Sequence, residues 1–160
     1  MRRAFTLAEL LVVVVILTIA AAMIVPQVTG MGELRSRSAA RLILADLEYA
    51  QSRAILDQAD TTVTFSTTGN DYTLTDSSTS TPLVHPITKK TYAVDFAQTK
   101  GLEDVSIDSA NFGGGASVTF DALGGPDPPQ GGTVTVIAGT HGYQVTVEAV
   151  TGQVTVTKVP

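Results

Sequence analysis

Residues 5–26 read FTLAELLVVVVILTIAAAMIVP, a run in which two threonines and one glutamate are the only polar residues. About 20 mostly apolar residues in a helix are enough to cross the bilayer core, which is about 30 Å thick. This stretch is therefore expected to form a helix that spans a membrane.

The charges on the N-terminal side of this run predict its orientation. Arg2 and Arg3 precede it, and the positive-inside rule places that end in the cytoplasm. The chain after residue 26 then lies on the opposite side of the membrane. It is more polar than the run and rich in threonine.

Two residues of the run are unusual for a plain anchor. Glu9 lies among apolar residues, where a charged side chain costs about 2.5–3.5 kcal/mol on insertion scales. Such a residue usually has a partner and a function. Pro26 lies at the end of the run, where it is able to kink or end a longer helix.

A secretory signal peptide has a similar pattern of basic residues followed by an apolar segment. The small residues Ala20, Ala21 and Ala22 would then allow signal peptidase to cut near Ala22. Composition alone leaves a signal peptide, a plain anchor and a specialised anchor open, although Glu9 fits the signal peptide poorly.

Residues 4–16, AFTLAELLVVVVI, resemble the class III signal of type IV pilins and type II secretion pseudopilins. The resemblance implies that a prepilin peptidase cuts between Ala4 and Phe5 and methylates the new amino group of Phe5. Glu9 then takes the fifth position of the mature chain and Pro26 the 22nd, where the family commonly has Glu and Pro. The family usually has glycine before the cut, where this chain has Ala4.

This resemblance also implies a role for Glu9 in assembly. In the family the acidic side chain is thought to neutralise the N-terminal amine of an adjacent subunit, and a buried carboxylate needs such a counter-charge. The implied partners are major and minor pseudopilins, the prepilin peptidase and the inner-membrane assembly platform. The implied location is the bacterial inner membrane, crossed once, with the head in the periplasm.

A second helix is expected over residues 33–57, after a flexible or unwound stretch at residues 27–32 that contains Gly30 and Gly32. Apolar residues recur on one face at three- and four-residue spacing, and charged residues fall largely off it. The apolar positions are Leu34, Ala40, Ile43, Leu44, Leu47, Ala50 and Ala54, and the charged ones are Arg35, Arg37, Arg41, Asp46, Glu48 and Arg53.

The end of this helix refines the resemblance. Ala40, Leu44, Leu47 and residues 50–54 (AQSRA), followed at once by a strand hairpin, are similar to the GspH/FimT branch of minor pseudopilins. That branch usually has arginine at the position of Gln51.

The rest of the chain predicts short antiparallel strands. Residues 62–66 and 71–75 alternate around a turn and predict a hairpin. Residues 76–90 and 123–132 are rich in Pro, Gly and Ser and predict loops. Further strands are expected at residues 92–96, 105–107, 117–120, 133–138, 143–150 and 153–159.

The predicted fold class is α+β, with a long N-terminal helical spine followed by an antiparallel β-sandwich head. The expected divisions are a leader peptide (residues 1–4), a transmembrane or filament-core helix (5–26), an amphipathic helix (27–58) and a periplasmic head (59–160).

The residues that could support chemistry form no regular pattern, so an enzyme, a metal site and a cofactor are not expected. His85 and His141 lack partners at metal-ligand spacing. Asp121 and Asp127 flank a loop without a regular calcium-binding pattern. The acids Glu103, Asp104 and Asp108 are read as a solvated face. The chain has no cysteine, which excludes disulfides and thiolate ligands.

Charge disfavours nucleic acid as a partner. The chain has a formal net charge of −5, and residues 54–160 hold four lysines against eleven acidic residues. Nucleic-acid binding needs clustered cations, although a contact through Lys89 and Lys90 stays open.

The function expected from these features is that of a structural minor pseudopilin in a type II secretion pseudopilus. Its head would contact other minor subunits and secreted cargo. The alternatives are a minor pilin of a type IV pilus or competence system, and a secreted β-sandwich binding module behind an ordinary signal peptide.

Overall fold

The computed structural model describes the backbone of residues 6–29 and 31–159. The chain divides into two compact units, Met1–Met31 and Gly32–Pro160. Helix α1 (Leu7–Thr29) belongs to the first unit. Helix α2 (Met31–Asp57), apart from its first residue, belongs to the second unit with all the strands.

The unwound stretch predicted over residues 27–32 is wrong for the described residues. α1 continues past Pro26 to Thr29, and α2 begins at Met31. Gly32 lies inside α2 and lets the helix approach Ala138 closely, because a Cβ there would lie 2.8 Å from the carbonyl oxygen of Ala138. The glycine therefore marks close packing and not a helix break.

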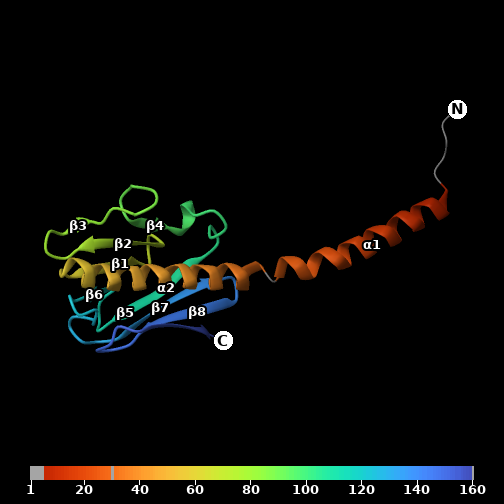
Figure 1. Ribbon diagram of the computed structural model, residues 1–160. Coiled ribbons are helices and arrows are strands. Elements are labelled where there is room, and N and C mark those ends of the chain that lie inside the picture. The colour runs from red at the N-terminus through yellow and green to blue at the C-terminus, as the bar shows by residue number, and fades with distance from the viewer. Residues whose placement is uncertain (1–5, 30, 160) are drawn as a thin grey trace. The chain divides into compact units, whose positions relative to one another are not determined.

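Two antiparallel sheets form the β-part (Figure 1). The first sheet has the strand order β3-β2-β1-β6, with β4 also paired to β2. Its strands are β1 (Thr61–Ser66), β2 (Asp71–Asp76), β3 (Thr81–Pro82), β4 (Ala93–Asp95) and β6 (Ser117–Phe120). The predicted hairpin of residues 62–66 and 71–75 is confirmed, with Val63 opposite Leu74.

The second sheet has the strand order β5-β7-β8-β9. Its strands are β5 (Ser106–Phe112), β7 (Gly132–Ala138), β8 (His141–Val147) and β9 (Val154–Val159). The α+β class with antiparallel sheets is confirmed, and Figure 1 shows α2 running along both sheets.

Several predicted elements differ from the structure, and the predicted strand 143–150 is β8, which ends at Val147. β5 is longer than predicted. A register shift between Ile107 and Ser109 breaks the alternation of its side chains, so the sequence pattern indicated only the start of the strand. Residues 92–96 end in a 3₁₀ helix (Phe96–Gln98), since the Asp95 carboxylate caps the backbone N–H of Ala97 at 2.8 Å. The predicted loop 76–90 contains β3, and Val84 pairs with Thr91 as an isolated bridge.

One core joins the buried face of α2 to both sheets. Strand residues alternate between buried and partly exposed positions, as in β7, where Val134, Val136 and Ala138 are buried. This is the period of two expected for strands with one face in a core. The largest fully buried side chains are Tyr72, Phe96, Phe120, Ile43, Leu47 and Leu74.

Asp46 is buried, contrary to its predicted place off the apolar face of the helix. Its carboxylate accepts hydrogen bonds from the hydroxyls of Tyr72 at 2.5 Å and Tyr92 at 2.9 Å. Burial raises the pKa of Asp46, and the two tyrosine hydrogen bonds partly oppose this rise. These two donors are what allow a carboxylate in the core.

The start of α2 is tied to the second sheet through Glu33. Its carboxylate accepts hydrogen bonds from the Lys158 ammonium at 2.7 Å and the Tyr143 hydroxyl at 3.3 Å. The hydrogen bond from Lys158 is the main reason that the pKa of Glu33 lies below its usual value. The contact is exposed, so it fixes position more than it stabilises the fold.

Candidate assembly site

The first turn of α1 is closed by reciprocal hydrogen bonds between Thr6 and Glu9. The Glu9 carboxylate accepts from the backbone N–H and the hydroxyl of Thr6, both at 3.0 Å. The Thr6 hydroxyl in turn accepts from the backbone N–H of Glu9 at 3.2 Å. This arrangement is a capping box. It gives the Glu9 carboxylate hydrogen-bond donors within its own chain. The signal for this box in the sequence is Thr-x-x-Glu before an apolar run.

The described part of α1 presents an apolar surface. Every side chain from residue 6 to residue 21 is exposed. The large apolar side chains among them are Leu7, Leu10, Leu11, Val12, Val13, Val14, Val15, Ile16, Leu17 and Ile19. Judged on the described residues, no helix combines the length and the apolar character that a membrane crossing requires.

The predicted processing and assembly residues are only partly described. Ala4 and Phe5, which flank the predicted cut, lie outside the described residues. The backbone of Pro26 is part of α1, but its side chain is not described. The capping box at Glu9 is thus the one part of the predicted site whose side-chain geometry is given.

The C-terminal part of α2 is joined to two loops of the second unit. We call residues 51–58, 121–125 and 148–152 together the distal end of that unit. The Gln51 amide joins its three segments by donating to the carbonyl oxygens of Gly124 at 2.6 Å and Thr151 at 3.2 Å. Gly152 is required there, because a Cβ would lie 2.5 Å from the carbonyl oxygen of Gly124. The local sequence around Gln51 does not predict this contact, because its partners are 73 and 100 residues away.

Both histidine side chains contact neighbouring residues. The ring of His85 accepts backbone N–H bonds from Ile87 and Thr88 through Nδ1 and lies 4.5 Å from the ring of Tyr92. Nδ1 of His141 lies 3.4 Å from the Thr140 hydroxyl.

The acidic candidates also have local partners. Oδ1 of Asp121 accepts from the backbone N–H groups of Leu123 and Gly125, both at 2.9 Å, and so closes its own loop. Asp104 forms an ion pair with Arg35, and Glu103 accepts from the backbone N–H of Gly101. Across the described residues, no three His, Cys, Asp or Glu side chains are grouped as a metal site.

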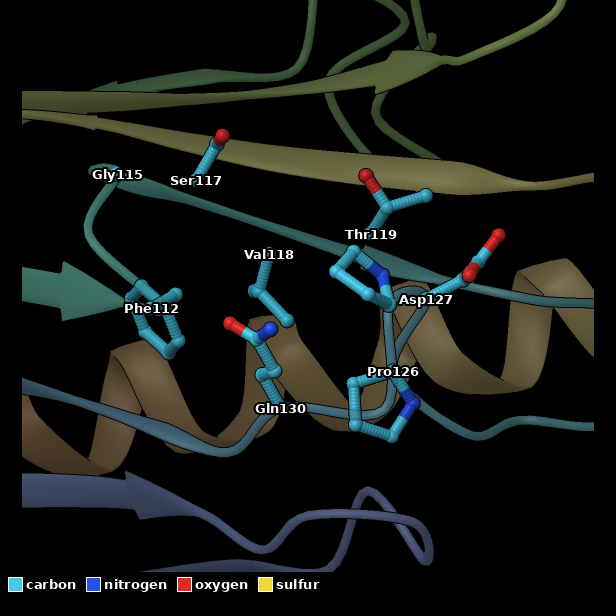
Figure 2. Close-up of a pocket in the computed structure, with 9 residues that line it drawn as sticks. Phe112, Gly115, Ser117, Val118, Thr119, Pro126, Asp127 and Gln130 are labelled. Carbon is cyan, nitrogen blue, oxygen red and sulfur yellow. The ribbon is translucent and has the colours of Figure 1, made fainter.

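A pocket of about 200 Å³ lies beside the edge strand β6 (Figure 2). Figure 2 shows Phe112, Val118 and Gln130 gathered at one side of it and Pro126 and Asp127 at the other. The Asp127 carboxylate is the one titratable group among the lining residues. The other polar side chains of the lining are those of Ser117, Thr119 and Gln130.

Two known family models match this chain, one at its N-terminus and one over α2 and the strands. The family described as type II transport protein GspH matches residues 39–152, and the prokaryotic N-terminal methylation motif matches residues 1–25. No curated protein matches the sequence.

Solved structures of minor pilin-like subunits share the fold. The type IV minor pilin FimU of Pseudomonas aeruginosa is 19% identical, with a TM-score of 0.53 over 76% of this chain and 91% of that one. The minor pseudopilin EpsH from the type 2 secretion system of Vibrio cholerae is 12% identical, with a TM-score of 0.58 over 78% of this chain and 97% of that one. The N-terminal motif, the α2-and-two-sheet architecture and the match over residues 39–152 together show that the chain belongs to the GspH family of type II transport proteins.

Proposed function

We propose that this chain is a minor pseudopilin that is processed by a prepilin peptidase and drawn into a type II secretion pseudopilus. The observation that carries the proposal is the methylation motif over residues 1–25, joined to a GspH match over residues 39–152. Its role is structural, as in the family to which it belongs.

The proposed processing removes residues 1–4 and leaves a methylated Phe5 as the first residue. The helix that follows then anchors the subunit once in the bacterial inner membrane, with the second unit in the periplasm. Arg2 and Arg3 before the apolar run support this orientation. The exposed apolar side chains of residues 7–19 support the anchoring. Lipid, and later the helices of neighbouring subunits, would cover those side chains.

The capping box suggests how Glu9 acts before and during assembly. In the free subunit the Thr6 backbone and hydroxyl satisfy the Glu9 carboxylate. On assembly the carboxylate would exchange one of these bonds for one from the cationic amine of a neighbour, in which both the donor and the acceptor are charged. Assembly can thus proceed without ever leaving this carboxylate unpaired.

Co-assembly tests the proposal. The tagged chain is produced together with a major pseudopilin, a prepilin peptidase and the assembly platform, and pili sheared from the cells are analysed by immunoblot. We expect the chain in the sheared filaments, and in the membrane alone when the peptidase is inactive. A chain that stays out of the filaments with the complete apparatus present would contradict the proposal.

The likeness to FimU keeps a type IV minor pilin as the second candidate. The same experiment with a type IV pilus apparatus separates the two. The GspH match favours type II secretion.

A further inference from the structure

Residues 84–91, between β3 and β4, form a small hairpin that projects from the first sheet (Figure 1). Val84 pairs with Thr91, and the backbone N–H of His85 donates to the carbonyl oxygen of Lys90 at 2.8 Å. We call these residues the β3–β4 hairpin. Its two adjacent lysines have no part in the proposed function.

The tip of this hairpin exposes apolar side chains beside two cations. Ile87 is 84% exposed and Val84 is 60% exposed. Lys89 and Lys90 follow closely and are also exposed. Lys89 lines one cavity, together with Val84, and Lys90 lines a different cavity, together with Thr91. The two lysines therefore flank the tip at which Ile87 lies.

The tip is held in this shape by its own hydrogen bonds. Nδ1 of His85 accepts the backbone N–H groups of Ile87 and Thr88 at 3.2 and 3.3 Å. The backbone N–H of Lys89 donates to the carbonyl oxygen of His85 at 3.0 Å. The His85 ring lies 4.5 Å from the ring of Tyr92, which is buried. Because the tip is already ordered, binding a partner would cost it little conformational entropy.

The hairpin is a cationic region in an acidic unit. Residues 77–94 contain two lysines and no acidic residue, whereas residues 54–160 as a whole hold eleven acidic residues. The carboxylates that flank this segment, Asp76 and Asp95, accept hydrogen bonds from backbone N–H groups of their own turns. Within the described part of the chain, neither Lys89 nor Lys90 forms an ion pair. Both charges are therefore available to an anionic partner.

A bilayer with anionic headgroups matches both the charge and the apolar tip of the hairpin. Its phosphates lie above the acyl chains, so an apolar side chain can enter this boundary while neighbouring lysines keep their ammonium groups at the headgroups. Duplex DNA would leave Ile87 in water, and its binding needs more clustered cations than two. An acidic protein surface would match the lysines alone.

We propose that the β3–β4 hairpin docks on the anionic phospholipid surface of the membrane in which the chain is anchored. Ile87 would enter the boundary between headgroups and acyl chains, and Lys89 and Lys90 would bind lipid phosphates. One isoleucine and two lysines bind a bilayer weakly from solution, but an anchored chain experiences a high effective concentration of lipid. The proposal rests on the proposed function only for the anchor.

The fluorescence of a single probe tests this docking, because the chain has no native cysteine. The full-length Thr88→Cys chain is labelled with nitrobenzoxadiazole, which brightens when it leaves water. It is reconstituted in phosphatidylcholine vesicles with or without about 30% phosphatidylglycerol. We expect emission about twofold brighter in the anionic vesicles, quenched by nitroxide-labelled acyl chains and lost in high salt. The same label on Thr64→Cys, an exposed position on β1, should be equally bright in both.

Substitutions in the labelled protein identify the groups that dock. Ile87→Ser, and the pair Lys89→Gln with Lys90→Gln, should each reduce the brightening by at least about half. The matched controls are Leu123→Ser, at a side chain that is 88% exposed, and Lys100→Gln, at an exposed lysine outside the hairpin, and both should leave it unchanged. Equal brightness in neutral and anionic vesicles, or controls that reduce it as much as the hairpin variants do, would overturn the proposal.

Melting temperature and flotation with the vesicles are measured on the same samples. A hairpin variant that loses the brightening but keeps the wild-type melting temperature supports docking, since unfolding is then excluded as the cause. A wild-type chain that floats with the anionic vesicles and shows no brightening refutes the docking alone. A chain that fails to float with any vesicle instead refutes the membrane anchor of the proposed function.

Discussion

In the proposed assembly Glu9 has two roles, and one set of substitutions separates them. As the last residue of a capping box it accepts the Thr6 backbone N–H, a role that glutamine also fills. As the counter-charge of a neighbouring amine it needs its negative charge. Thr6→Ala removes the capping hydroxyl and leaves that charge in place.

We predict that Glu9→Gln and Glu9→Ala both abolish co-assembly, whereas Thr6→Ala keeps most of it and costs about 1 kcal/mol of local helix stability. Co-assembly is measured by immunoblot of sheared filaments, with membrane fractionation as the control for insertion. Wild-type assembly of Glu9→Gln together with loss in Glu9→Ala would show that capping, and not charge, is what assembly needs.

Asp46 gives a prediction for the core. Asp46→Ala leaves the hydroxyls of Tyr72 and Tyr92 without their acceptor. A buried polar group without a partner costs about 1–3 kcal/mol, so we expect a loss of about 2–4 kcal/mol in the free energy of unfolding. Asp46→Asn keeps an acceptor oxygen and should lose less. Urea unfolding followed by tyrosine fluorescence measures both, and a loss below about 1 kcal/mol for the alanine variant would contradict the buried network.

The raised pKa of Asp46 also predicts that the free energy of unfolding depends on pH. Burial raises the pKa of Asp46 above its ordinary value of 3.8. The stability that this group contributes is therefore complete below that ordinary value and is lost as the pH rises through the raised pKa. Because asparagine does not titrate, the stability of Asp46→Asn relative to the wild type should increase with pH over this window. A difference between the two proteins that stays constant from pH 3.5 upward would refute the raised pKa.

Gln51 and Asp46 show where prediction from single residues stops. Period and composition place both on a helix, but neither reveals that loops 121–125 and 148–152 fold back to the Gln51 amide. Nor do they show that Tyr72 of β2 and Tyr92, which directly precedes β4, supply donors to Asp46. These partners are 26 to 100 residues away in sequence, so they depend on the tertiary fold.

At the scale of elements, Gly32 shows a conflict between propensity and packing. Alanine favours a helix by about 1 kcal/mol over glycine, but its Cβ would lie 2.8 Å from the backbone oxygen of Ala138. Overpacking of this kind costs about 1–3 kcal/mol, so Gly32→Ala should lower stability, by up to about 2 kcal/mol. Thermal unfolding by circular dichroism measures it against Ser38→Ala, an exposed position on the same helix. A stabilised Gly32→Ala protein would contradict the close contact with β7.

The regular elements could be read from the sequence, and the irregular ones could not. Alternating valine and threonine predict β7, and the 3.6-residue period predicts α2 to within a few residues. The register shift within β5 and the 3₁₀ helix after Asp95 have no periodic signal. The pairing order of the strands also follows from long-range packing, and sequence period does not encode it.

At the scale of the whole molecule, the negative charge of residues 54–160 argues against DNA uptake as the function. Residues 54–160 carry four lysines and eleven acidic residues, so release of DNA counterions would supply little binding energy. We predict no binding of duplex DNA at micromolar protein in 50 mM salt, measured by fluorescence anisotropy. Binding that weakens steeply with added salt would instead favour a competence pilin.

The central claim is that the chain is a prepilin-like subunit, and the mass of its native N-terminus tests this most directly. The full-length chain is purified from membranes of cells that contain a prepilin peptidase and is analysed by intact-mass and peptide mass spectrometry, with peptidase-deficient cells as the control. The account predicts a chain that begins at N-methylated Phe5 and that begins at Met1 only in the control. A chain that begins at Met23, or still at Met1 when the peptidase is active, would contradict it.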